Sequence, residues 1–166
     1  SLGTVNNRSR SFYRACLEAL RSWEGVRAVL SLGGGCRPEE LGDVPPNVQV
    51  FPQVDQLAVL SQSDAFLSHC GMNSVSESLY LGVPLVLFPQ QEEQGMVARR
   101  VQELGAGVPL PAPTPAAIHQ ALSLVLADPA FQHSAQHISE GFRAAGGYRR
   151  GADKILEAAM GSAPLR

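Results

Sequence analysis

The chain alternates short apolar runs with segments of helical periodicity, and this alternation constrains the fold more than any other feature. Short runs that are rich in β-branched residues and closed by glycine or polar residues are typical of buried strands. Such runs are VRAVLSL (26–32), VQVF (48–51), AFLS (65–68), LVLF (85–88) and a weaker GVPL (107–110). Helical spacing is found near residues 12–23, 55–62, 73–81, 93–104, 115–126, 130–145 and 150–160. Strands that alternate with helices predict an α/β domain with a parallel sheet and helices on both of its faces.

Length and charge exclude several classes of protein. The chain has 166 residues, 45% of them apolar, and a net charge of −2, which suits one domain able to bury a core. Thirteen basic residues stand against fifteen acidic ones with no block of one sign, so neither nucleic acid nor a membrane surface is an expected partner. No apolar stretch approaches the roughly 20 residues of a membrane-spanning helix, and no signal peptide is recognised.

The cysteine pattern favours a reducing compartment. Cys16, Cys36 and Cys70 are odd in number and show no C-x-x-C spacing, so neither a disulfide framework nor a zinc site is expected. A cytoplasmic location fits this pattern best. The first residues, Ser1-Leu2-Gly3-Thr4, read as the end of a strand running into a turn, which suggests a piece of a longer protein.

A polar cluster marks one strand-to-helix corner, in the stretch SHCGMNSVSESLYLGVP (68–84). His69, Asn73 and Ser74 gather around Gly71, between an apolar run and a helical pattern. In open parallel sheets, ligands bind beyond the carboxyl ends of strands, and the first turn of a helix offers free N–H groups to a phosphate. The corner therefore predicts an anion site. The simpler alternative makes Asn73 an N-cap and His69 an ordinary loop histidine.

Two other strand ends favour the binding site over that alternative. PQQEEQ (89–94) follows one expected strand, and GGG (33–35) follows another. All three strand ends fall on one edge of a parallel sheet, so a shared site explains them better than three coincidences.

The central stretch NVQVF…DQLAVL…DAFLSHCGMNSVSESLYLGVPLVLFPQQEEQGMVARRVQELGAG resembles the nucleotide-sugar-binding half of family-1 glycosyltransferases, particularly the macrolide-type enzymes. The resemblance extends from SLGT at the start to GFRAAGGYRRGADKILEAA near the end. It implies a Rossmann-like parallel sheet that forms one half of a GT-B glycosyltransferase. Residues 1–166 would then be a single C-terminal donor-binding domain, and the partner would be an N-terminal acceptor-binding domain that this chain lacks.

The resemblance also implies roles for individual residues. The implied diphosphate-binding residues are Ser1, Gly3, Thr4, His69, Gly71, Asn73 and Ser74. The implied nucleoside-binding residues are Gln53, Val54, Gln56 and Glu77, with the last two at the ribose. The implied sugar-binding residues are Glu93 and Gln94. The chain departs from the family's W-x-P-Q pattern, because Gln53 stands at the aromatic position and Asp55 at the proline.

The activity that the resemblance implies is an inverting transfer of a hexose, most simply glucose from UDP-glucose, to a hydroxyl of a small lipophilic acceptor. Uridine is the expected base and thymidine stays open. The UDP-sugar is a substrate, and neither a metal nor a separate cofactor is implied. No residue of this chain is expected to be catalytic, since the general base would lie in the N-terminal half. The alternatives are a stand-alone nucleotide-binding module and half of a sugar-nucleotide epimerase, both without transfer activity.

The remaining candidates have simpler explanations. Cys70 beside His69 is an unlikely nucleophile, because adjacent residues in an extended stretch point to opposite sides. His133 and His137 have the i, i+4 spacing of a metal pair but lack a third ligand nearby, so they are expected at the surface together with His119. Trp23 lies at helical spacing and is expected in the core.

Overall fold

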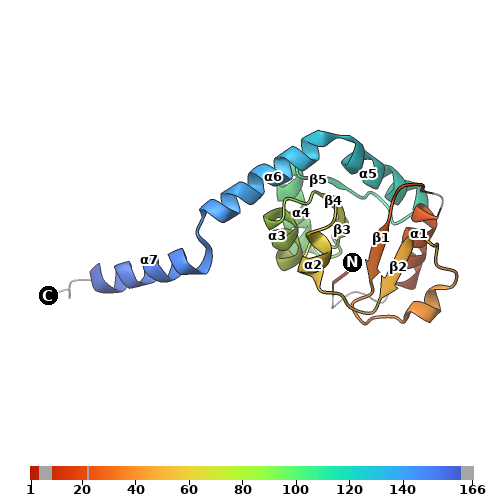
Figure 1. The fold of residues 1–166 in the computed structure, drawn as a ribbon, viewed down its shortest axis with the longest axis horizontal. Helices are drawn as coiled ribbons and strands as arrows, with labels where there is room; N and C mark the ends of the chain where they lie inside the picture. Colours follow the sequence, from red (N-terminus) through yellow and green to blue (C-terminus); the bar gives the residue numbers. More distant parts are fainter. Residues whose placement is uncertain (4–8, 22, 162–166) are drawn as a thin grey trace.

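The computed structural model describes residues 1–3, 9–21 and 23–161. The elements follow one another in the order α1 (Arg10–Leu20), β1 (Ala28–Ser31), a short 3₁₀ helix η1 (Pro38–Leu41), β2 (Val48–Phe51), α2 (Gln56–Leu60), β3 (Phe66–Ser68), α3 (Met72–Tyr80), β4 (Leu85–Leu87), α4 (Glu92–Glu103), β5 (Gly107–Pro109), α5 (Pro115–Ala127), α6 (Pro129–Ala144) and α7 (Gly147–Gly161). Figure 1 shows this alternation of strands and helices. The expected strands and helices are all confirmed, although every strand except β2 is shorter than the apolar run that contains it.

All strand pairs are parallel, as predicted, but the described strands form two sheets where the sequence suggested one. β1 pairs with β2, while β4 lies between β3 and β5 in a second sheet. A cavity separates β1 from β3, so these two strands do not reach each other. Parallel pairing still brings the carboxyl ends of the strands in each sheet to one edge.

Helices cover both faces of the sheets, as the sequence predicts. On β4, Val86 joins the core cluster formed with α1 and α5, whereas Leu85 and Leu87 join the cluster formed with α3 and α4. This alternation follows from the two-residue period of a strand, and every residue of β4 is buried because both of its faces are covered.

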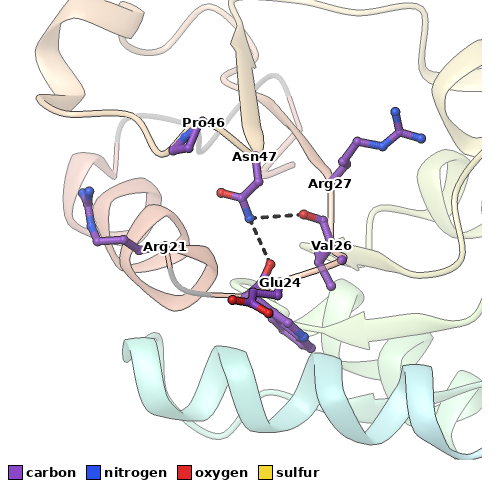
Figure 2. A pocket seen from close by; sticks show the side chains of 8 residues that line it. Arg21, Glu24, Val26, Arg27, Pro46 and Asn47 are labelled. Carbon is purple, nitrogen blue, oxygen red and sulfur yellow. Dashed lines mark hydrogen bonds between the residues drawn. The ribbon is translucent and has the colours of Figure 1, made fainter.

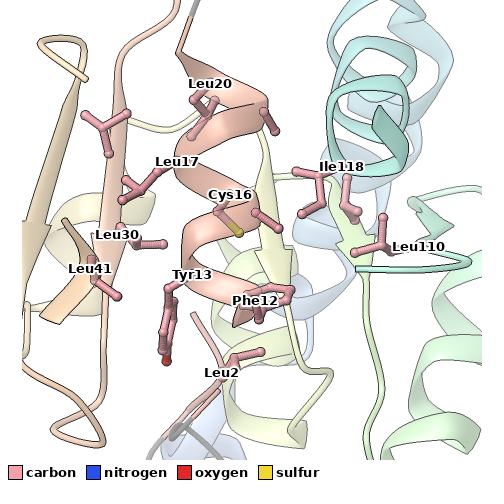
Figure 3. Close-up of a cluster of buried hydrophobic side chains, with 14 of the residues drawn as sticks. Leu2, Phe12, Tyr13, Cys16, Leu17, Leu20, Leu30, Leu41, Leu110 and Ile118 are labelled. Atoms are coloured by element: carbon pink, nitrogen blue, oxygen red, sulfur yellow. The ribbon is translucent and has the colours of Figure 1, made fainter. Parts of the chain in front are cut away.

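The larger core cluster joins the two sheets into one body. Figure 3 shows Phe12, Cys16 and Leu20 of α1 between Leu30 of β1 and Ile118 of α5. α1 begins at Arg10 after Ser9, whose hydroxyl accepts the Phe12 amide, and one face of the helix is apolar at every turn. The core that α1 shares with α5 therefore bridges the space between the sheets.

The carboxyl-terminal helices begin where their caps predict. Thr114 accepts the amide of Ala117 and Pro115 is the first residue of α5, which is the expected start. Asp128 caps α6 in the same way. α7 extends away from the body in Figure 1, and Ile155 and Leu156 are 71% and 56% exposed.

The prediction for Trp23 is confirmed in part, and the predictions for the three histidines are confirmed. Trp23 packs against the core cluster but is only half-buried, and its ring lies 4.3 Å from that of His119, centroid to centroid. His119, His133 and His137 are all exposed, as expected. None of the helices in the described ranges has the length and apolar content needed to cross a membrane.

Candidate functional site

The corner between β3 and α3 leaves the first turn of the helix open to a ligand. α3 begins at Met72, and its N-cap is Gly71, which has no side chain to accept a hydrogen bond. Asn73 lies inside the first turn with an exposed side chain, so the interpretation of Asn73 as the cap is wrong. Uncapped N–H groups carry partial positive charge, and they are the groups that bind phosphate at helix starts.

Cys70 makes the sharp turn into this corner. Its φ of 67° is the only positive value among the described non-glycine residues, and its amide donates to the Ser68 hydroxyl at 3.1 Å. The thiol is fully buried, and burial raises the pKa of Cys70 to about 12. A thiol that stays protonated is a poor nucleophile, so a catalytic role for Cys70 is not supported. The expected extended backbone at Cys70 is wrong, because the chain turns sharply there, but the prediction that Cys70 is not a nucleophile agrees with its raised pKa.

His69 is held between two glycines. A β-carbon on Gly3 would lie 2.6 Å from the imidazole Cε1, and one on Gly71 would lie 2.5 Å from Nε2. Only glycine leaves room for the ring on both sides. Gly71 was expected to admit a ligand, whereas in the structure its missing side chain admits His69.

Burial keeps the His69 ring neutral. Loss of solvation on burial lowers the pKa of His69. Nδ1 is buried and has no hydrogen-bond partner among the described residues. A neutral imidazole carries a single N–H, so its orientation decides what it can donate to.

Gln56, Ser74 and Glu77 meet beside the first turn of α3. The Gln56 side-chain amide donates to Ser74 Oγ at 3.2 Å and to Glu77 Oε2 at 2.6 Å. Gln56 is the first residue of α2, while the other two lie one turn apart on α3. These contacts place the start of α2 against the start of α3, so the sheet edge after β2 adjoins the edge after β3. All three side chains are half-buried and accessible to a ligand.

Asp55, where the family has proline, is the N-cap of α2. Its carboxylate accepts the amide of Ala58 at 3.1 Å. This cap was not predicted, although an acidic residue just before a helical segment is a signal for one. The preceding Gln53 is exposed and Val54 is half-buried, in the loop that joins β2 to α2.

Glu93 and Gln94 lie in the first turn of α4, as expected. α4 follows β4, the strand beside β3, so the starts of α3 and α4 are neighbours at one sheet edge. The Gln94 side-chain oxygen accepts the amide of Gln90 at 2.9 Å, which orders the loop after β4. Glu93 is exposed, so its carboxylate is open to solvent and to a ligand.

Two further implied residues, Ser1 and Gly3, lie near His69 at the start of the chain. The Ser1 amine donates to the Leu67 carbonyl at 2.9 Å, and Gly3 turns there with a φ of 71°. Thr4 lies outside the described residues. After β1, Gly33 and Gly34 also have positive φ values, and the Gly34 amide donates to the Pro52 carbonyl.

Two cavities lie near these elements, and neither encloses the whole cluster. The larger, of about 810 Å³, includes Ser1, Val54 and Gln56 in its walls but not His69 or Glu93. The other, of about 630 Å³, lies at the opposite end of β1 and β2 (Figure 2). There the Asn47 side chain donates to the carbonyls of Leu20 and Val26, which fastens the loop between α1 and β1. The candidate site is therefore an open surface at the sheet edge and is not enclosed by either cavity.

No group of three or more His, Cys, Asp or Glu residues that could hold a metal is found in the described part of the chain.

Comparisons with known proteins agree with this arrangement. Residues 27–147 match a family profile described as erythromycin biosynthesis protein CIII-like, C-terminal domain. The chain is 40% identical over 159 residues to the NDP-glycosyltransferase YjiC of Bacillus subtilis, and it covers 40% of that protein's length. It is 36% identical over 160 residues to the uncharacterized UDP-glucosyltransferase YojK of the same organism, and covers 39% of it. These alignments include 93% and 95% of the present chain.

A solved structure gives the same result for the fold. The calicheamicin glycosyltransferase CalG4 superposes with a TM-score of 0.87 at 32% identity, over 98% of this chain and 42% of CalG4. The chain thus spans about two fifths of the length of its relatives. Because the family profile matches most of the chain, the chain belongs to the macrolide-type family-1 glycosyltransferases, as a C-terminal domain that forms half of a GT-B fold.

Proposed function

We propose that this chain is the donor-binding domain of an inverting glycosyltransferase and that its donor is a nucleotide sugar, most simply UDP-glucose. The observation that carries the proposal is the contact of Gln56 with Ser74 and Glu77 beside the uncapped start of α3. The names of the two Bacillus relatives specify a UDP-glucosyl donor in one case and an unspecified NDP-sugar in the other. UDP-glucose is therefore the first donor to test, and a thymidine diphosphate sugar is the second.

The diphosphate would bind at the start of α3. The open N–H groups of the first turn and the Ser74 hydroxyl would donate to its oxygens, and His69 would add one N–H. Negative charge grows on this diphosphate as the bond to the sugar breaks. Donors that are already in place stabilise that charge without reorganisation, which is how this domain would lower the barrier to transfer.

The nucleoside and the sugar would lie on either side of the diphosphate. The Glu77 carboxylate can accept hydrogen bonds from both ribose hydroxyls, and Gln56 already holds one of its oxygens in place. Glu93 and Gln94, at the start of the neighbouring α4, would read the hydroxyls of the hexose. Gln53 and Val54 would face the base, where an exposed amide replaces an aromatic ring.

The acceptor and its base would come from an N-terminal domain of the full-length enzyme. No residue of the candidate site is assigned as the base that takes the acceptor's proton, because each one serves the donor in this proposal. The acceptor would be a small lipophilic molecule with a free hydroxyl.

Calorimetric titration with UDP, dTDP, GDP and their glucose conjugates tests the proposal. We expect UDP and UDP-glucose to bind most tightly and the His69→Ala variant to bind UDP about tenfold more weakly, because a hydrogen bond to a charged group contributes about 1.5–3 kcal/mol. His133→Ala, an exposed histidine on α6, is the matched control and should bind normally. Unchanged affinity in His69→Ala, or no preference among the nucleotides, would contradict the assignment.

A further inference from the structure

The chain between β3 and α3 buries two side chains and presents the one between them. Ser68 and Cys70 are both 0% exposed, whereas His69 is half-buried. Ser68 is the last residue of β3, and Gly71 is the N-cap of α3. The chain therefore leaves the strand, presents one imidazole and enters the helix between residues 68 and 71. The contacts of the two buried residues decide where that imidazole lies.

Ser68 is fixed to the sheet by its main chain. Its carbonyl accepts the amide of Phe88 at 2.9 Å, which continues the pairing of β3 with β4 beyond the end of β4. The Cys70 thiol donates to the same carbonyl at 3.5 Å. Because the backbone at Ser68 belongs to the sheet, its hydroxyl is held in a fixed place from which it can stabilise the turn that follows.

The backbone at Cys70 adopts a conformation that needs such support. Its φ of 67° lies in the left-handed region, where a β-carbon approaches the backbone too closely. Ser68 Oγ accepts the Cys70 amide at 3.1 Å, in the pattern by which serine side chains stabilise turns two residues on. Both groups are buried, so bulk water does not compete for this hydrogen bond or replace it.

The turn at Cys70 sends neighbouring side chains in different directions. The Cys70 thiol lies in the apolar cluster formed with α3 and α4. The His69 ring lies against the backbone of Gly71, where an added β-carbon would be 2.5 Å from Nε2. Rotation about φ of Cys70 would move His69 relative to Gly71. This one torsion angle therefore sets the position of the imidazole relative to the start of α3.

We propose that Ser68 is a positioning residue of the diphosphate site: its buried hydroxyl holds the left-handed turn at Cys70, which places the His69 imidazole beside the start of α3. The identity of the ligand rests on the proposed function, whereas the placement of the imidazole does not. Ser68 touches no ligand in this assignment and acts only through the turn. If only a fraction of the molecules holds the turn, the apparent affinity falls by that fraction.

Two substitutions of similar shape test the role of the hydroxyl. Ser68→Thr keeps the oxygen, whereas Ser68→Val puts a methyl group in its place. NMR measures the nuclear Overhauser effect (NOE) between His69 Hε1 and Gly71 Hα, and calorimetry measures UDP affinity. Ser68→Thr should retain the NOE and the affinity. Ser68→Val should lose the NOE and bind UDP about fivefold more weakly or worse, because a buried N–H without a partner is costly.

Two further variants separate the placement of His69 from a general loss of stability. Ser78 is also 0% exposed, and its hydroxyl donates to the Val83 carbonyl at 2.8 Å. Ser78→Ala should lower the unfolding temperature but leave the NOE and the UDP affinity unchanged. Adding Cys70→Gly to Ser68→Val should restore UDP affinity, because glycine adopts a positive φ without a side-chain penalty.

Several results would overturn the proposal. One is the same NOE and the same UDP affinity in Ser68→Thr and Ser68→Val. Another is normal UDP affinity in Ser68→Val despite a lost NOE, since the hydroxyl would then shape the corner without serving the ligand. An equal loss of affinity in Ser78→Ala, or no recovery on adding Cys70→Gly, would also contradict it. If the unsubstituted chain binds no nucleotide, the proposed function fails, and the NOE comparison still decides whether Ser68 places His69.

Discussion

At the scale of single residues, the candidate site depends on what glycine lacks as much as on what its polar side chains offer. Gly3 and Gly71 leave space on two sides of the His69 ring, and the pKa of that ring is lowered by burial. A neutral imidazole in a fixed place offers one N–H in a fixed direction. The polar residue and the two glycines around it therefore act as one unit.

Gly71→Ala tests this unit. The new methyl group would lie within 2.5 Å of Nε2, so the ring must move, and overpacking of this kind costs about 1–3 kcal/mol of unfolding free energy. We expect a lower unfolding temperature together with weaker UDP binding. Gly141→Ala is the control, since open space surrounds that glycine on α6 and the change should add about 0.5–1 kcal/mol. Normal UDP affinity in Gly71→Ala would mean that the ring position is unimportant for binding.

Gln56 holds the second unit of the site. Gln56→Ala removes the hydrogen bonds to Ser74 and Glu77 and should cost about 1 kcal/mol of stability. Gln56→Glu keeps the size of the side chain but sets a second carboxylate against Glu77, so it should destabilise more than alanine at pH 7. The two variants should approach each other below about pH 5, where carboxyl groups take up protons.

Thermal unfolding of both variants at pH 7 and at about pH 4.5, close to the ordinary pKa of a glutamate side chain, measures this difference. Gln120→Glu, an exposed change on α5, controls for added charge. If the glutamate variant is as stable as the alanine variant at pH 7, Gln56 does not face Glu77 in solution.

At the scale of elements, the site is built from neighbouring helix starts. α3 and α4 follow β3 and β4, which are paired, so their first turns lie side by side at one sheet edge. The N-caps of both helices, Gly71 and Gln91, make no side-chain hydrogen bond, whereas α2 and α5 are capped by Asp55 and Thr114. The helix starts assigned to the diphosphate and to the sugar therefore have no side-chain cap, whereas the start of α2, beside the nucleoside, is capped.

Because α3 and α4 are assigned to different parts of the ligand, changes on α4 should affect the affinities for UDP and UDP-glucose differently. Because Glu93 and Gln94 belong to α4 and the diphosphate is assigned to α3, Glu93→Ala/Gln94→Ala should weaken UDP-glucose binding and leave UDP binding nearly unchanged. Calorimetry with both ligands measures the two affinities. Gln102→Ala, an exposed glutamine near the other end of α4, is the control. An equal loss for both ligands would assign the pair to the nucleotide or to the fold.

At the scale of the whole molecule, the described residues form a body with the candidate site at one sheet edge, and α7 projects away from that body. α7 exposes Tyr148, Ile155, Leu156 and Met160, which are large apolar side chains. The resemblance implies that the carboxy-terminal helix packs toward an N-terminal half, and an exposed apolar face is what such packing would cover.

This chain alone should bind donor and transfer nothing. Transfer needs an acceptor held against the anomeric carbon and a base within hydrogen-bond reach of its hydroxyl, and all assigned residues serve the donor. Product analysis with phenolic and macrolide acceptors should show no glucosylation above the His69→Ala background. Addition of an N-terminal half in trans should restore some activity. Turnover by the 166-residue chain alone would place a catalytic base within it and would contradict the two-domain mechanism.

The sequence by itself determined the local structure and the chemistry of the rim. Apolar runs and helical spacing located the described strands and α-helices, because burial requires a period of two or 3.6 residues that is visible without coordinates. The short 3₁₀ helix η1 was not predicted. Thr114 and Pro115 located the start of α5 for a similarly local reason. The identity of the polar residues at the corner also needed no coordinates.

Only the tertiary structure decided which groups meet. The contact of Gln56 with Ser74 joins residues 18 positions apart, and the fit of His69 against Gly3 joins the start of the chain to β3. The cap of α3 and the division into two sheets were likewise not predictable, because backbone torsions at one turn and the pairing of distant edges depend on packing from several elements at once. A sequence pattern shows the structural preference of one segment, whereas a tertiary contact depends on how all the segments pack together.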